Sequence, residues 1–221
     1  MCNTKVPTNE QSLKAYYCTY LSHMNYLAHA FLSFNQPDIL AGNMFSDFVK
    51  GKKRYEFSPG IQRGITLHRA IDEYTDSHPA TKEARQVFQT AYGLYSAVFM
   101  DVVYDHFLAL DNTQFSDESL KKFSQLTYNI LDEYLAVFPE KFRILFPFMK
   151  EYDWLYNYSH LKGIERSFEG IAHRARFMSE SGTAFKLFKE HYATLQTCYN
   201  AFFPELKVFA FDTMNALQFS K

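Results

Sequence analysis

The chain has 221 residues, enough for one domain with a large core, and 47% of them are hydrophobic, including 23 Phe and 16 Tyr. Only 8 Gly and 7 Pro are present, which favours long helices over many short strands and turns. A net charge of −1 excludes recognition of nucleic acid through overall charge. No apolar stretch approaches the ~20 residues of a membrane span, so we expect neither nucleic acid nor a membrane as partner.

The first 23 residues differ from the rest of the chain. They are polar, weakly patterned and without the continuous apolar segment of a secretory signal. The three cysteines, Cys2, Cys18 and Cys198, are odd in number and lack CxxC spacing, which fits a reducing cytosol. We therefore expect a cytoplasmic protein with an N-terminal extension at 1–23 and one helical domain at 24–221.

The first half of the chain predicts six helices, over 26–32, 39–49, 59–77, 80–91, 94–110 and 117–137. The first is apolar almost all round, which is typical of a buried helix. Gly51 suits the C-cap of the second, while Ser58 and Pro59 suit the N-cap and first position of the third. Ser116 is the expected N-cap of the sixth.

The second half continues the helical pattern. Pro139 and Pro147 bracket a shorter helix, and 151–158 is aromatic and less regular. Helices over 160–178, 183–200 and 204–216 follow. Because there is no strand alternation, internal repeat or interdomain linker, we predict a single all-α domain.

A stripe of His68, Asp72 and Asp76 occupies one face of the predicted helix 59–77, four residues apart. An imidazole and two carboxylates in this arrangement can hold a divalent metal or form a hydrogen-bonded polar seam. Leu67 and Ile71 indicate buried flanks, where carboxylates need a cation or donors to offset desolvation. The simpler alternative is a face of solvated acids beside one core histidine.

A second stripe, Asp101 and Asp105 with the adjoining His106, lies in the apolar helix 94–110. Aspartate is almost never fully buried unless it is paired. The alternative to a metal site is an Asp–Arg or Asp–Tyr pair within the core. His106 is adjacent to Asp105 rather than one turn away, so it points elsewhere and is either a supporting contact of the site or purely structural.

Two further residues extend this chemistry. His29 lies in the most hydrophobic helix, where a lone histidine is more often a core residue than a ligand, and Asp47 lies between apolar residues near a helix end. The pooled metal-ligand candidates are His29, Asp47, His68, Asp72 and Asp105, with Asp76 and Asp101 in reserve. Nitrogen and oxygen ligands without thiolate suit Mn²⁺, Fe²⁺ or Mg²⁺ better than structural Zn²⁺. Such an ion binds a phosphate oxygen and turns a bound water into a hydroxide nucleophile.

A basic run follows Asp47 at once: Lys50, Lys52, Lys53 and Arg54. It is either a solvated loop or a rim that steers an anionic substrate or an acidic partner protein toward the site. The chain has no P-loop, GxGxxG, GxSxG or HExxH pattern. Nucleotide binding through a glycine-rich loop and serine-triad hydrolysis are therefore disfavoured.

These residues resemble those of a known family, the acyl carrier protein phosphodiesterases. Four blocks carry the resemblance in the family's order, at 24–29 (MNYLAH), 41–51 (AGNMFSDFVKG), 64–72 (GITLHRAID) and 101–108 (DVVYDHFL). The likeness runs from residue 24 to about residue 217 and is sharp through about residue 110. It implies an all-helical, distorted HD-type phosphohydrolase that removes 4′-phosphopantetheine from holo-acyl carrier protein with Mn²⁺ or a similar ion.

The resemblance also implies roles for individual residues. Asp47 falls on the family's essential aspartate, and the other four ligand candidates match recurrent His and Asp positions. In the implied mechanism Asp76 or Asp101 accepts the proton of the attacking water, while Arg69 or Lys50 neutralises developing charge. The basic run then contacts the acidic surface of the carrier protein. One departure is that His68 and Asp72 are four apart, whereas the orthodox HD motif has His and Asp adjacent.

Three alternatives remain open from the sequence. One is an HD-like phosphohydrolase that acts on another phosphate, such as a nucleotide. Another is a helical module that binds a carrier protein without chemistry. The third is an all-helical protein whose acids form networks in the core, so that replacing Asp72 or Asp105 lowers stability rather than activity.

Overall fold

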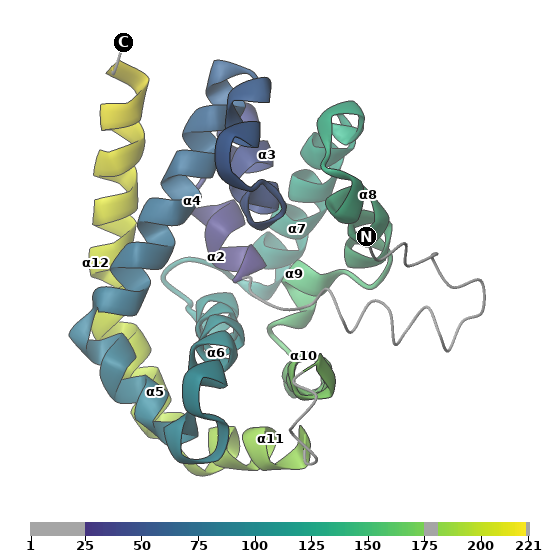
Figure 1. Ribbon diagram of the computed structural model, residues 1–221. Helices are drawn as coiled ribbons and strands as arrows, with labels where there is room; N and C mark the ends of the chain where they lie inside the picture. The colour runs from purple at the N-terminus through teal and green to yellow at the C-terminus, as the bar shows by residue number, and fades with distance from the viewer. Residues whose placement is uncertain (1–24, 175–180, 220–221) are drawn as a thin grey trace.

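The structure is a computed structural model that describes residues 25–174 and 181–219 (Figure 1). Every regular element in these residues is helical, so the all-α prediction is confirmed. The proposed extension at 1–23 lies outside the described residues. The α-helices are α2 (Tyr26–Phe31), α3 (Pro37–Phe45), α4 (Pro59–Ser77), α5 (Pro79–Tyr92), α6 (Ser96–Leu110), α7 (Asp117–Asp132), α8 (Glu140–Glu151), α9 (Trp154–Asn157), α10 (Leu161–Arg174), α11 (Ser181–Glu190) and α12 (Tyr192–Phe219).

Short 3₁₀ helices join several of these α-helices. They are η1 (Ser46–Phe48), η2 (Gly51–Glu56), η3 (Gly93–Tyr95) and η4 (Leu135–Val137). The first, η1, replaces the end of the helix predicted over 39–49, because α3 stops at Phe45 and the chain tightens around Asp47. This change of direction turns Asp47 toward α4 instead of continuing along α3.

Two glycines allow α3 and α4 to touch backbone to backbone. A Cβ added to Gly42 would lie 2.1 Å from the carbonyl oxygen of Ile61, and one added to Gly64 would lie 2.3 Å from that of Ile39. Both distances are far below van der Waals contact, so neither position accepts a side chain without separation of the helices. The close approach brings the end of α3 beside His68 of α4.

The C-terminal helix supports the opposite side of α4. In Figure 1, α12 runs beside α4 and α5, and the Tyr74 and Phe209 rings stack with their centroids 4.4 Å apart. Phe202 stacks on Tyr104 of α6 at 4.8 Å, which links the same helix to the core. Tyr74 and Phe209 are half-buried whereas Phe202 and Tyr104 are buried, so α12 packs on α4 and α6 through aromatic contacts.

Two prolines that were expected to end or begin helices in the C-terminal half lie inside helices instead. Pro147 lies inside α8 and Pro204 inside α12, where two separate helices were expected over 183–200 and 204–216. A proline within a helix costs about 3 kcal/mol, and buried neighbours such as Phe146 and Phe203 offset that cost. Conversely, α7 ends at Asp132, before the predicted end at 137.

None of the described helices combines the length and apolarity needed to cross a bilayer. The longest, α12, has 28 residues but carries Glu205, Lys207 and Asp212 along its length. Charged side chains spaced through a helix in this way are costly in hydrocarbon.

Candidate metal centre

Three side chains from two helices converge at one point. His29 projects from α2, and His68 and Asp72 project from α4. Asp72 Oδ1 lies 3.2 Å from His29 Nε2, and Asp72 Oδ2 lies 3.2 Å from His68 Nε2. One ligand atom from each of the three residues lies within 4.8 Å of the others. The imidazoles are buried whereas 46% of the Asp72 side chain is exposed, so the centre opens to solvent on the carboxylate side.

The orientation of His68 is fixed by the backbone. Its Nδ1 lies 2.8 Å from the carbonyl oxygen of Asn43, which can only accept, so Nδ1 carries the hydrogen. In the neutral imidazole Nε2 then holds a lone pair, although it faces two carboxylates, Asp47 at 3.1 Å and Asp72 at 3.2 Å. A lone pair directed at two anions requires a proton or a metal cation between them.

Protonation satisfies this requirement when no cation is bound. Burial lowers the pKa of His68, but hydrogen bonds to Asp47 and Asp72 outweigh it and raise the pKa to about 10. Burial also opposes ionisation of Asp72, yet its close contacts with the two imidazoles hold its pKa below the usual range. The three side chains therefore have the arrangement of a group that could hold a metal ion.

His29 is the neutral member of the pair. Its ring stacks on that of His68, with centroids 4.0 Å apart and planes 19° apart. Burial and the charge on His68 lower the pKa of His29. Within the described residues neither ring nitrogen of His29 makes a hydrogen bond, because the 3.2 Å approach to Asp72 lacks hydrogen-bond direction. A buried imidazole with an unshared lone pair is suited to bind a metal ion.

A buried polar network holds the two histidines in register. Asn43 Nδ2 donates to the backbone oxygen of His29 at 2.8 Å and to Ser33 Oγ at 3.1 Å. Ser33 Oγ donates to the same oxygen of His29 at 2.8 Å. Asn43 was not among the residues predicted from the sequence; its signal there is an amide inside a helix whose other residues are mostly apolar and buried. These hydrogen bonds between buried polar groups hold the backbone of His29 beside α3.

The α6 residues separate into three environments. Asp105 is fully buried, and its oxygens accept the backbone amides of Leu27 and Ala28, both at 2.9 Å. It therefore lies outside the three-residue group and anchors the first turn of α2, which carries His29. Burial raises the pKa of Asp105, whereas the amides favour the charged form.

The other two α6 residues lie on different sides of the helix. Asp101 is half-buried, and burial together with the negative charge of Asp72 raises its pKa. His106 points away: its Nδ1 donates to the carbonyl oxygen of Tyr158 at 2.7 Å, and its Nε2 accepts from the hydroxyl of Tyr192 at 3.0 Å. His106 therefore supports the packing of α6 and takes no part in the centre.

The remaining predicted residues lie around this centre. Asp76 is exposed and pairs with Arg85 at 3.4 Å, and exposed Arg69 donates to the carbonyl oxygen of Val49 at 3.1 Å. Lys50, Lys52 and Lys53 are exposed. Arg54 is half-buried and lies 4.7 Å from the centre of the Tyr55 ring. The basic segment thus forms a charged surface next to Asp47 in the chain.

The donor set fits a divalent cation. Two imidazole nitrogens and a carboxylate converge, a second carboxylate from Asp47 adjoins them, and no thiolate takes part. Sets of two histidines and one carboxylate are typical of sites for catalytic first-row transition metals. Nδ1 of His68 is bound to a carbonyl, which is the usual outer contact of a metal-ligating histidine.

The fold and this centre define an all-helical protein with a histidine–carboxylate site of the kind that binds divalent cations. The sequence profile described as "Acyl carrier protein phosphodiesterase" matches residues 24–206. The chain belongs to the acyl carrier protein phosphodiesterase family.

Relatives of the same name support this assignment. The protein of Photorhabdus laumondii is 32% identical over 182 residues, which cover 82% of this chain and 92% of the relative. That of Yersinia enterocolitica is 33% identical over 184 residues, covering 83% and 95%. That of Escherichia coli O157:H7 is 31% identical with the same coverage. No solved structure matches the chain.

Proposed function

We propose that this protein hydrolyses holo-acyl carrier protein to apo-acyl carrier protein and 4′-phosphopantetheine, with a divalent cation bound at His29, His68, Asp72 and Asp47. Water adds to the phosphorus, the bond to the serine oxygen of the carrier breaks, and that oxygen takes up a proton. The observation that carries the proposal is Nε2 of His68, which faces two carboxylates while Nδ1 is bound to a carbonyl oxygen. As part of the same proposal, we assign the helical fold to the HD-type phosphohydrolases, in a distorted form.

The cation, which we propose is Mn²⁺, with Mg²⁺ and Fe²⁺ as alternatives, would be held by His29, His68, Asp72 and Asp47. When bound, it would supply polarisation of the phosphodiester and activation of water. Among the residues of the chain, Asp101 is the preferred proton acceptor, because burial and Asp72 raise its affinity for a proton. Asp76 is less suited, since it is exposed and paired with Arg85. Asp105 acts by holding α2, and so positions His29.

The exposed basic segment, Lys50, Lys52, Lys53 and Arg54, is the proposed contact for the carrier protein. Arg69 follows His68 in the chain and donates a hydrogen bond to the carbonyl of Val49, the residue before Lys50; it would neutralise phosphate charge. Attraction between exposed charges of opposite sign is screened by salt, with a Debye length of about 10 Å at 0.1 M ionic strength. We therefore expect the KM for holo-acyl carrier protein to rise with ionic strength. We also propose that the enzyme acts in the cytosol.

The test is to incubate the protein with holo-acyl carrier protein and Mn²⁺ and to weigh the products by mass spectrometry. We expect loss of phosphopantetheine that requires metal and is abolished by Asp47→Asn. The matched control is Asp212→Asn, the same chemical change at an exposed position of α12. An unchanged mass with every divalent ion would refute the proposal. Carrier binding without cleavage would favour a binding module, and cleavage of nucleotides alone would favour another phosphohydrolase.

A further inference from the structure

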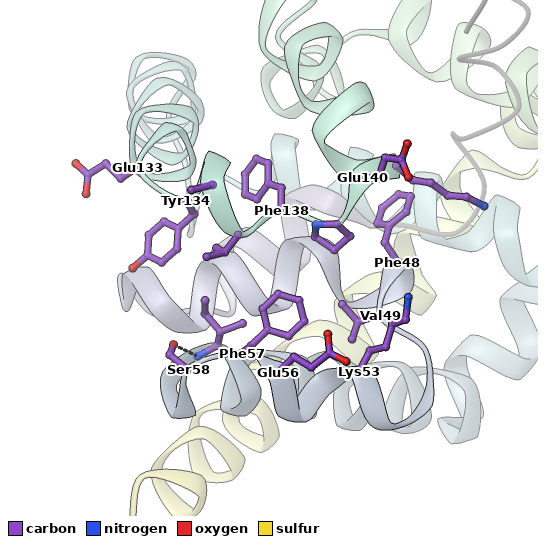
Figure 2. A pocket seen from close by; sticks show the side chains of 15 residues that line it. Phe48, Val49, Lys53, Glu56, Phe57, Ser58, Glu133, Tyr134, Phe138 and Glu140 are labelled. Atoms are coloured by element: carbon purple, nitrogen blue, oxygen red, sulfur yellow. Dashed lines mark hydrogen bonds between the residues drawn. The ribbon is translucent and has the colours of Figure 1, made fainter. Parts of the chain in front are cut away.

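A groove of about 810 Å³ lies between the segment from η1 to the start of α4 and the segment from the end of α7 to the start of α8. Figure 2 shows Phe48, Val49 and Lys53 at one end and Glu133, Tyr134 and Ser58 at the other. Its volume falls within the roughly 300–1,000 Å³ typical of small-molecule sites. His29, His68 and Asp72 do not line it.

One end of the groove nevertheless adjoins the segment of the chain that carries Asp47. Phe48 and Val49, which line one end, follow Asp47 directly, and Asp47 lies 3.1 Å from His68. The carbonyl oxygen of Val49 accepts a hydrogen bond from Arg69, the residue after His68. Lys53 lies at this same end together with Glu140 (Figure 2), and Lys141 also lines the groove. A ligand in the groove can therefore place an anionic end toward the centre.

The middle of the groove is aromatic and well supported. Phe57 and Phe138 come from its two walls, and both contact the buried Phe45, with ring centroids 5.2 Å and 5.9 Å apart. Phe48 packs on Phe142 at 5.6 Å. Because these rings are fixed from below, the apolar floor is preformed and does not require rearrangement to receive a ligand.

The far end of the groove is polar. The Ser58 hydroxyl caps α4 by accepting the amide of Ile61, and the Tyr134 hydroxyl donates to Asp38 at 2.6 Å. Glu133 lies there as well, and Glu56 lies along the wall. A ligand that matches this groove carries a negative charge at one end, apolar groups in the middle and hydrogen-bonding groups along its length. A purely hydrocarbon chain would leave the polar end without a matching partner.

We propose that this groove binds the pantetheine arm of the substrate, with the phosphate directed toward Asp47 and Lys53. The inference rests on the proposed function and extends it, because it assigns a binding site to the part of the substrate that remains attached to the phosphate. The gem-dimethyl and methylene groups of the arm fit the Phe57 and Phe138 floor, and its two amides supply the hydrogen bonds that the polar groups require. Binding through a remote arm positions the phosphodiester for attack.

The test fills the groove without touching the metal centre. Ala136 and Val137 line the groove from η4 and are exposed, so Ala136→Trp and Val137→Trp occupy it with little effect on the core. Leu135→Trp, on the same turn but outside the lining, is the matched control. Binding of 4′-phosphopantetheine to the metal-free protein is measured by isothermal titration calorimetry. We expect both groove variants to weaken binding at least about tenfold and the control to match the wild type.

Each outcome decides between the two proposals. Equal binding by the groove variants and the control, or no binding by the wild type, overturns the groove assignment. If the groove variants lose affinity for apo-acyl carrier protein but keep affinity for 4′-phosphopantetheine, the groove binds the carrier surface and the assignment is also overturned. Binding of 4′-phosphopantetheine that depends on the groove, together with no cleavage of holo-acyl carrier protein, supports the groove and refutes the hydrolase.

Discussion

Helices α4 and α6 carry similar patterns of acids and histidine, yet the structure uses them differently. On α4, His68 and Asp72 meet His29 in a centre that opens to solvent. On α6, Asp105 anchors a neighbouring helix and His106 packs against two tyrosines. The difference comes from burial: α6 is enclosed along most of its length, whereas α4 leaves one carboxylate half exposed. The same pattern therefore predicts chemistry only where solvent and substrate can enter.

The largest effect is expected from Asp72→Asn. This change removes the anion that contacts both imidazoles, and with it a ligand of the proposed cation. Stabilisation by such a cation is worth several kcal/mol, so turnover of holo-acyl carrier protein should fall about 1,000-fold. Titration with Mn²⁺, followed by electron paramagnetic resonance, should show weaker binding. Turnover within a factor of ten of the wild type would show that Asp72 of α4 is not needed for catalysis.

A smaller effect on catalysis and a larger one on folding are expected from Asp105→Asn. One amide of the α2 turn then loses its acceptor in a fully buried place, which costs about 1–3 kcal/mol of unfolding free energy. Displacement of His29 should weaken Mn²⁺ binding by about 10–100-fold, as for other groups that orient metal ligands.

The control for this variant is Asp111→Asn at the C-cap of α6, where the half-buried carboxylate accepts the amide of Thr113 and the hydroxyl of Tyr199. Urea unfolding of both variants measures the difference, and we expect the Asp111 change to cost less. An Asp105→Asn protein of unchanged stability that fails to bind Mn²⁺ would instead make Asp105 a direct ligand, as first predicted from the sequence.

The smallest effect concerns His106 and pH. Burial lowers its pKa below the usual 6.5, so below that pH the unfolded chain binds a proton that the folded chain resists. Stability from this residue is present above pH 6.5 and is lost as the pH falls through the folded pKa. The melting temperature of metal-free wild type should therefore drop more between pH 7.5 and pH 5.5 than that of His106→Gln. Equal drops would show that His106 is not held neutral.

The sequence predicted the helical class and the pair His68 and Asp72, because both follow from spacing within one helix. It did not separate Asp105 from the ligand candidates, since spacing says nothing of the backbone amides of a distant helix. Asn43 was missed for the same reason: its role depends on contacts with α2 and α4. The continuous α12 was missed because tertiary packing outweighs the local effect of Pro204.

The contact between Gly42 and Gly64 has a consequence for the evolution of this centre. A methyl group at either position would force the two helices apart by an ångström or more, on the order of the 1 Å misplacement that can cost 100-fold in rate. A diverged copy could thus keep every histidine and aspartate and still lose its chemistry through a single alanine. Among distantly related sequences, glycine at both positions should therefore distinguish active enzymes from inactive ones better than the presence of the metal-ligand residues does.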